Sequence, residues 1–362
     1  MNAPELSSPA ERARHDLQRR QRRVRARLIL LAVFLPVAML AAVATGAVDF
    51  NASNFWSALL AGPGAVASDP SSPNLASILW GIRMPRVVLA ALVGGALALA
   101  GAAVQGLFRN PLADPGLIGV SAGAAVGAVL CFLFGWQGLC GGWLLPLMAF
   151  VGSLGAVLLL RAFNTGFEAG GTAKLILAGV ALNALLGSVL GFALYSASDS
   201  ALRSMTFWTL GGCGGASWLQ NGVLVVFFLV AAVVLGRQAR ALDALQLGEA
   251  QAAHLGVSID RVRGEIIVAS ALLVGAATAF AGVIGFIGLV APHMARLLLG
   301  GLHRWILPGA VLLGATLLVL ADLGARTLVA PAELAVGILT AAAGAPFFLW
   351  LLRRPSSWSA TR

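Results

Sequence analysis

The feature that most constrains this chain is a series of apolar segments, each about 20 residues long, that recur between residues 28 and 352. An α-helix of about 20 apolar residues crosses a hydrocarbon core of about 30 Å. Only 10% of the residues are charged and 59% are hydrophobic, whereas soluble domains carry about 25% charged residues. The polar surface is too small for a water-soluble globule. We therefore predict an all-α, polytopic membrane protein.

We predict about ten transmembrane helices. The seventh and eighth helices are separated by a break at Gly282–Gly288. Three glycines at intervals of three weaken helix continuity there. One merged, kinked span is the alternative. The first apolar run is longer than the 7–15 residues of a cleavable signal peptide, so we expect it to remain as the first helix. The predicted spans are 28–48, 87–107, 116–135, 143–162, 174–196, 218–236, 264–283, 284–302, 306–325 and 333–352.

The basic residues predict the topology. Eight of the 24 lie between Arg12 and Arg27, ahead of the first apolar run. If the N-terminus is cytoplasmic, 20 basic residues face the cytoplasm and 4 face outward, as the positive-inside rule requires. Merging two spans would send Arg353 and Arg354 outside. We therefore expect ten spans with both termini cytoplasmic, and charge of this kind argues against nucleic acid as a partner.

This topology divides the chain into a basic cytoplasmic tail (1–27), a transmembrane domain (28–352) and a short cytoplasmic tail (353–362). The outer segment 49–82, with Pro63 and Asp69 among its turn-forming residues, is predicted to be an irregular loop. The outer segment 197–217 contains Phe207 and Trp208, which suit a short helix at the membrane interface. The longest inner loop is 237–263, and it is also the most polar.

A stretch of this inner loop, Gly248-Glu249-Ala250-Gln251-Ala252-Ala253-His254-Leu255-Gly256-Val257, is typical of a short helix between glycines. Its acid lies near the N-terminus, where the helix dipole favours negative charge. So short a helix is marginal alone in water, so it needs a protein surface to pack against. The alternative is a solvated connector.

Four further stretches follow in order along residues 80–352. They are Arg83-Met84-Pro85-Arg86 leading into Gly94-Gly95-Ala96-Leu97-Ala98-Leu99-Ala100-Gly101; Gln105-Gly106 followed by Arg109-Asn110-Pro111-Leu112-Ala113-Asp114-Pro115-Gly116-Leu117-Ile118-Gly119; Gly285-Phe286-Ile287-Gly288-Leu289-Val290-Ala291-Pro292-His293-Met294-Ala295-Arg296; and Gly344-Ala345-Pro346-Phe347-Phe348. Together with the inner stretch, they make the chain resemble the permease subunits of ABC importers for iron-siderophores, haem and cobalamin. The basic N-terminal tail lies outside this resemblance.

The resemblance implies roles for three groups of residues. The inner stretch is similar to the coupling helix that seats in the ATPase, with Gly248, Glu249, Ala252, Leu255 and Gly256 as its characteristic residues. Three arginines at outer span ends match those that hold a periplasmic binding protein through Arg–Glu pairs; snorkelling to lipid headgroups is the alternative. Two polar residues of the fifth span match the pathway wall, with helix–helix hydrogen bonding as the alternative. The arginines are Arg83, Arg86 and Arg326, and the pathway residues are Asn183 and Ser188.

The resemblance also implies the partners. They are a second copy of the chain, two cytoplasmic ATPase subunits, a periplasmic substrate-binding protein and the lipid of a bacterial inner membrane. The chain has no phosphate-binding loop of the form GxxxxGK[ST], so ATP and Mg²⁺ are expected on the ATPase. We expect no cofactor, no catalytic residues and no metal site on this chain, because the three cysteines lack ligand spacing. His293 is expected to pack or hydrogen-bond, and His254 and His303 to be solvated.

The substrate is the least determined point. The stretch Phe207-Trp208-Thr209-Leu210-Gly211-Gly212 is slightly more similar to haem permeases, and a ferric siderophore or cobalamin is the alternative. An ion-coupled secondary transporter or channel is the alternative from another class. Such proteins usually carry acids within the membrane. Here the acids lie near span ends, at Asp114, Glu265, Asp322 and Glu333.

Overall fold

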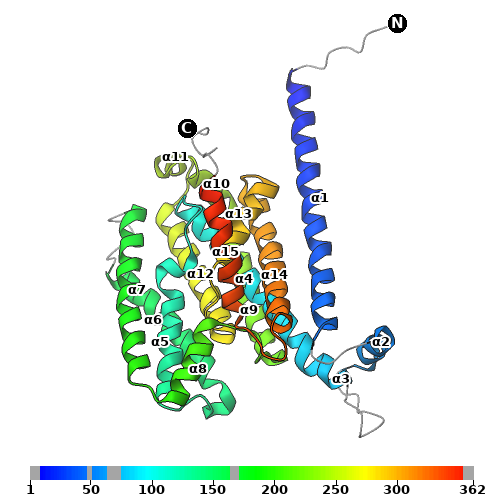
Figure 1. The fold of residues 1–362 in the computed structure, drawn as a ribbon. Coiled ribbons are helices and arrows are strands. Elements are labelled where there is room, and N and C mark those ends of the chain that lie inside the picture. Colours follow the sequence, from blue (N-terminus) through cyan, green and yellow to red (C-terminus); the bar gives the residue numbers. More distant parts are fainter. Residues whose placement is uncertain (1–8, 47–50, 63–74, 164–170, 354–362) are drawn as a thin grey trace.

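The structure is a computed structural model that describes residues 9–46, 51–62, 75–163 and 171–353. Its regular elements are helices throughout these ranges (Figure 1). They are α1 (Pro9–Ala44), α2 (Ala52–Ala61), α3 (Leu75–Ile78), a π-helical segment (Leu79–Arg83), α4 (Met84–Leu107), a 3-10 turn (Pro115–Ile118), α5 (Val120–Leu133), a second 3-10 turn (Leu139–Gly142), α6 (Leu144–Phe163), α7 (Gly171–Tyr195), α8 (Asp199–Leu210), α9 (Trp218–Arg237), α10 (Ala239–Leu245), α11 (Glu249–His254), α12 (Ile259–Ala281), α13 (Ile287–Leu299), α14 (His303–Thr327) and α15 (Val336–Leu352).

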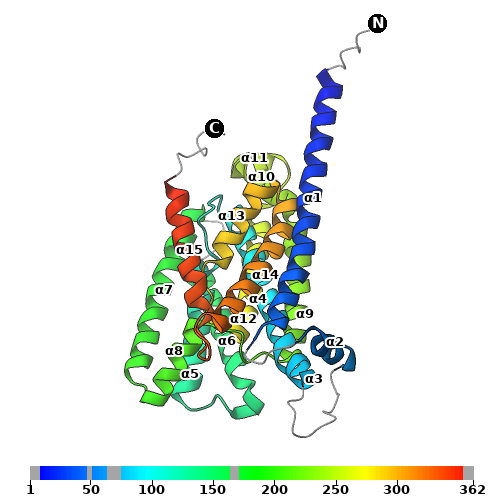
Figure 2. The same ribbon diagram turned by 45° about the vertical axis from the view of Figure 1, so that its right-hand side comes forward.

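The apolar helices agree with the predicted spans. Among the described residues, 7 helical stretches are long and apolar enough to cross a membrane, and three shorter apolar helices are α5, α13 and α15. The start of α1 and the end of α15 lie at the end of the molecule that carries α10 and α11 (Figure 1). Helices α2, α3 and α8 lie at the opposite end in both views (Figure 2). An even number of crossings, as predicted, brings the two ends of the helical domain to one side.

The predicted break between the seventh and eighth spans is confirmed. Helix α12 ends at Ala281, residues 282–286 are non-helical, and α13 begins at Ile287. Gly282 has a φ of 68°, and a Cβ built there would lie 2.2 Å from the carbonyl oxygen of Trp208. The extended segment therefore packs directly on the end of α8, and this close approach excludes a merged span.

Helix α4 occupies the centre of the bundle, where it packs against α12, α13 and α14. Two glycines of the sequence motifs make this packing possible. A Cβ on Gly94 would lie 2.2 Å from the carbonyl oxygen of Gly314 on α14, and one on Gly101 would lie 1.9 Å from that of Gly288 on α13. Small residues let helix backbones approach closely where lipid supplies no hydrophobic driving force.

Two sequence-based expectations about the outer and N-terminal segments need correction. The segment 49–82 is not simply an irregular loop, because it contains α2, α3 and the π-helical segment; its residues 63–74, including Pro63 and Asp69, lie outside the described residues. The π-helical turn precedes Pro85, which has no N–H to donate to a regular α-helical bond. Helix α1 begins at Pro9 rather than near residue 28, so it includes much of the basic tail. The predicted short helix in 197–217 is confirmed as α8.

Candidate functional site

The inner loop folds into two short helices, α10 and α11, which project at one end of the bundle (Figure 1). Gly248 (φ 118°) and Gly256 (φ 82°) bound α11 in conformations that side chains rarely adopt. Ala252, on α11 itself, is buried, whereas Leu247 and Leu255, just outside the two ends of α11, are each 65% exposed. The predicted coupling residues thus form one compact unit with two apolar side chains on its surface.

A buried arginine attaches α11 to the bundle. Arg263, on the first turns of α12, donates to Glu249 Oε1 at 3.1 Å and to Asp260 Oδ1 at 3.2 Å. Its side chain is 6% exposed, whereas that of Glu249 is 43% exposed. A charge-assisted hydrogen bond therefore links α11 to α12. Sequence analysis counted Arg263 only among the 20 basic residues expected on the cytoplasmic side and did not predict these contacts.

Helix α10 is attached to two other long helices. Asp243 Oδ1 accepts from the backbone N–H of His303 at 2.8 Å and lies 2.7 Å from His303 Nδ1, at the start of α14. Gln246 donates to the carbonyl oxygen of Gly106 at 3.1 Å, at the end of α4. The expectation that His303 is solvated is wrong, because it is 1% exposed against this carboxylate. No spacing pattern joins residues 243 and 303, so this pair could not be predicted from the sequence.

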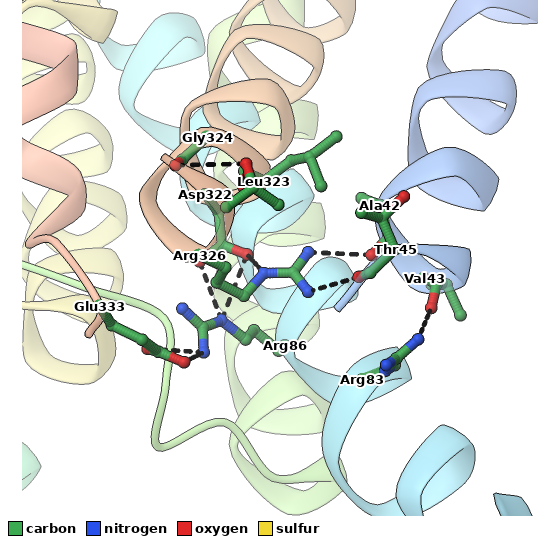
Figure 3. A network of polar contacts seen from close by, with 11 residues as sticks. Ala42, Val43, Thr45, Arg83, Arg86, Asp322, Leu323, Gly324, Arg326 and Glu333 are labelled. Carbon is green, nitrogen blue, oxygen red and sulfur yellow. Dashed lines mark hydrogen bonds and ion pairs between the residues drawn. The ribbon is translucent and has the colours of Figure 1, made fainter. Parts of the chain in front are cut away.

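The three outer arginines lie in one region, and two of them, Arg86 and Arg326, contact the same buried carboxylate, that of Asp322 (Figure 3). Arg86 Nε donates to Asp322 Oδ1 at 2.9 Å, and its Nη1 contacts Glu333 Oε2 at 3.0 Å. Asp322 is 1% exposed on its side chain, whereas Glu333 is 55% exposed. Arg86 therefore contacts one buried carboxylate, that of Asp322, and one exposed carboxylate, that of Glu333. Sequence analysis named both acids but did not pair them with Arg86.

The other two arginines bind the end of α1. Arg326 donates from Nε to Asp322 Oδ2 at 3.1 Å and from its terminal nitrogens to the carbonyl oxygens of Thr45 and Ala42, at 3.0 and 2.9 Å. Arg83 Nη1 donates to the carbonyl oxygen of Val43 at 3.0 Å (Figure 3). These carbonyls end α1 and lack helical partners, so cationic donors suit them.

This outer arginine cluster, defined as Arg83, Arg86 and Arg326 with Asp322 and Glu333, is a junction within the chain. Arg83 and Arg86 are 5% and 8% exposed, so they are not extended toward lipid headgroups. The intramolecular partners occupy them in this conformation. Docking of a binding protein by these arginines stays a prediction.

The two predicted pathway residues lie on α7. Asn183 Nδ2 donates to the carbonyl oxygen of Gly116 at 3.1 Å, in the 3-10 turn. Ser188 donates to Ala184 O at 3.0 Å within its own helix, and its side chain is exposed. Asn183 thus makes the inter-element hydrogen bond that sequence analysis named as the alternative to pathway lining. The face that carries Ser188 is uncovered in the single chain.

Residues of separate sequence motifs contact one another near α4. Gln105 donates to the carbonyl oxygens of Gly288 and Leu289, at 3.3 Å each, and accepts from Arg296. Asp114 caps the 3-10 turn by accepting from the N–H of Gly116 at 2.7 Å. Burial raises the pKa of the Asp114 carboxyl, and this hydrogen bond opposes the increase. The motifs are therefore one structural unit.

The remaining candidates are His293 and the three cysteines. His293 is buried beside Phe347, with ring centroids 6.1 Å apart, which fits the predicted packing role. Cys131, Cys140 and Cys213 are free thiols. Burial raises the pKa of the Cys213 thiol above its usual range. Within the described ranges, no group of three or more His, Cys, Asp or Glu side chains is placed to hold a metal ion.

An apolar helical bundle whose long helices are tied to a small polar helix unit at one end is an architecture that suits a membrane transport protein. The chain belongs to the FecCD transport family, whose model matches residues 32–354. It is 42% identical over 337 residues to the hemin transport system permease protein HmuU of Yersinia pestis, covering 92% of this chain and 97% of that protein.

Two further relatives support this assignment. The vitamin B12 import system permease protein BtuC of Salmonella paratyphi A is 44% identical over 274 residues, covering 76% of this chain and 83% of that protein. A solved structure of an inward-facing ABC transporter, assigned to the metal-chelate type, matches with a TM-score of 0.79 and 30% identity over 91% of this chain and 99% of that one. The chain is therefore the permease subunit of an ABC importer, a multi-pass protein of the bacterial inner membrane.

Proposed function

We propose that this permease carries an iron chelate, with haem as the leading substrate, from the periplasm to the cytoplasm by alternating access. The observation that carries the mechanism is the attachment of α10 and α11 to three long helices. Glu249, Asp243 and Gln246 reach α12, α14 and α4 respectively. A force applied to the α10–α11 unit is therefore delivered to the centre of the bundle.

The partner that applies this force is a separate ATPase. Leu247 and Leu255 expose apolar side chains at the inner end of the bundle, in a segment too polar to lie in lipid. Burial of each against a partner contributes about 1.5–3 kcal/mol. Two ATPase subunits, with ATP and Mg²⁺ at their own sites, would seat one α10–α11 unit each and move it when they close.

A second copy of the chain would complete the pathway. Helix α7 packs one face on α5, α6 and the 3-10 turn, and its other face is uncovered. That face combines large residues, such as Phe192 (73% exposed) and Tyr195 (90% exposed), with the small residues Gly187 and Ser188. Small residues suit a close approach between transmembrane helices, so this face fits a homodimer with Ser188 beside a central path.

Docking of a periplasmic binding protein is proposed at Arg86. Glu333 is the exposed partner of Arg86, whereas Asp322 is buried. A glutamate of the binding protein would replace Glu333 and leave the Asp322 bond intact. Exposed charge pairs of this kind mainly set encounter rate and orientation. Replacement of Glu333 by Gln should therefore strengthen capture.

The support for haem is the similarity to the hemin permease over nearly the whole chain. The slightly higher identity to a vitamin B12 permease over a shorter segment keeps cobalamin as the second candidate, with a ferric siderophore as a third. The deciding experiment reconstitutes the chain in liposomes with its ATPase and binding protein. ATP hydrolysis stimulated by haem, and by neither cobalamin nor a siderophore, supports the proposal. Stimulation only by cobalamin or by the siderophore contradicts the choice of haem.

A further inference from the structure

The basic segment of α1, residues 15–27, has no part in the function proposed above. It precedes the region that matches the family, which begins at residue 32. Its helix is continuous with the apolar part of α1 and passes the end of α13 (Figure 2). The positive charge of this segment predicts the membrane topology. Charge that served topology alone would not need to lie on one side of the helix.

Four of the six arginines of this segment lie on one side of the helix. These four line a groove of about 500 Å³ between α1 and the end of α13. At 100° per residue these positions lie within one sector of the helix, Arg25 lies on the opposite side, and Arg22 lies beside that sector without lining the groove. One acidic residue, Asp16, also lines the groove, so positive charge predominates. The groove arginines are Arg19, Arg20, Arg23 and Arg27.

The opposite wall of the groove is apolar. It is formed by residues 297–299 of α13, and Gly300 closes it. Val24 of α1, 6% exposed, lies between the arginines. The groove therefore presents guanidinium groups beside leucine side chains. Its volume is within the range of about 300–1,000 Å³ typical of small-molecule sites.

Capping of α13 explains only one of the four arginines. Arg27 donates to the carbonyl oxygen of Leu298, in the last turn of α13. The other three, Arg19, Arg20 and Arg23, make no ion pair or hydrogen bond with any described residue. Their charges meet in the groove without a carboxylate partner, which leaves them available to an anion.

The predicted start of the first span places the groove near the level of the lipid headgroups. The arginines stop at Arg27, and the apolar run of α1 starts at Leu28. A second groove of about 420 Å³ adjoins the first through Arg20 and Val24, and it is lined by Trp305. Tryptophan is enriched at membrane interfaces. The guanidinium groups thus stand above the acyl chains, where phosphates of the bilayer lie.

We propose that this groove binds the headgroup of an anionic phospholipid, with the phosphate on Arg20 and Arg23 and the first part of the acyl chains on Leu297 and Leu298. Basic pockets between transmembrane helices on the cytoplasmic side suit anionic headgroups. The bound lipid also borders Asp243 and Gln246 through the second groove. It would hold α1 against the helices that carry the α10–α11 unit.

The test compares two double variants of the full chain with the same loss of charge. R20Q/R23Q removes two groove arginines, and R22Q/R25Q removes two arginines of the same helix that do not line the groove. Each purified chain is titrated in neutral detergent with phosphatidylglycerol or phosphatidylcholine, and bound lipid is counted by native mass spectrometry. We expect retention of phosphatidylglycerol by the wild type and R22Q/R25Q, and binding about 30-fold weaker in R20Q/R23Q, since each basic residue contributes about fivefold.

Three results would overturn the proposal. Equal loss in both variants would mean diffuse charge without a site. Equal retention of phosphatidylcholine would mean that the anion is not recognised. Displacement of the lipid by millimolar inorganic phosphate, with equal thermal stabilisation, would mean a soluble anion instead. If R20Q/R23Q does not elute as a folded chain, the single variants R20Q and R23Q serve against R22Q. The readout does not involve transport, so it is independent of the proposed function.

Discussion

Replacement of Asp322 by asparagine tests whether the outer arginine cluster is a buried junction. Asp322 is 1% exposed on its side chain and accepts from Arg86 and Arg326. Asparagine keeps the shape but removes the charge and half of the acceptor capacity. Loss of one partner from a buried ion pair costs about 3–5 kcal/mol.

The lower end of that range applies here. Arg86 retains Glu333, and Arg326 retains the carbonyl oxygens of Thr45 and Ala42. We therefore expect D322N to lose about 3 kcal/mol of stability, or about 6–12 °C in melting temperature at about 2–4 °C per kcal/mol. The measurement is thermal unfolding of the purified chain in detergent.

The matched control is E333Q, on the other side of the same arginine. The Glu333 side chain is 55% exposed, and exposed ion pairs contribute about 0–1 kcal/mol. E333Q should therefore melt within about 4 °C of the wild type. If D322N and E333Q lower the melting temperature equally, water reaches Asp322. The distinction between a buried carboxylate at Asp322 and an exposed one at Glu333 is then refuted.

Three further predictions concern other parts of the molecule. E249R places a like charge opposite Arg263, so substrate-loaded binding protein should no longer stimulate ATP hydrolysis although the chain inserts and folds; normal transport would remove the coupling role. Cys140 is exposed, and Cys213 is buried with a raised thiol pKa. An impermeant maleimide added to spheroplasts should therefore label only Cys140. Labelling of Cys140 only after lysis would mean that the topology is the reverse of the predicted one. Burial raises the pKa of the Asp114 carboxyl, so the folded chain favours the protonated form of this side chain. The stability that the protonated carboxyl contributes is lost as the pH rises through the pKa of the folded state. D114N should therefore melt higher than the wild type at about pH 8 but not at about pH 4, and a difference independent of pH would contradict this.

The sequence predicted the helices better than their contacts. Apolar runs and the glycines near residue 282 gave the spans and the break before Ile287, because both depend on local composition. The short helix bounded by Gly248 and Gly256 was predicted for the same reason. The start of α1 was missed, because charged residues that end a membrane span do not end a helix.

The candidate site shows the limit of local patterns. Arg86 was singled out as an outer cation, but its partners lie 236 and 247 residues away. His303 was expected in water because it was placed in an inner loop, yet its buried ring contacts the carboxylate of Asp243. Pairs of this kind depend on which helices are neighbours, and a single sequence carries no record of that arrangement.

The glycine contacts of α4 restrict how the permease moves. With backbones touching at Gly94–Gly314 and Gly101–Gly288, helices α4, α13 and α14 have no side-chain layer that could slide or be compressed. They would travel as one rigid block. Opening and closing of the transport pathway would then involve movement of α7 and α15, which pack against fewer helices of the same chain. A cross-link within the block should therefore leave transport unchanged, whereas a cross-link between the block and α7 should stop transport.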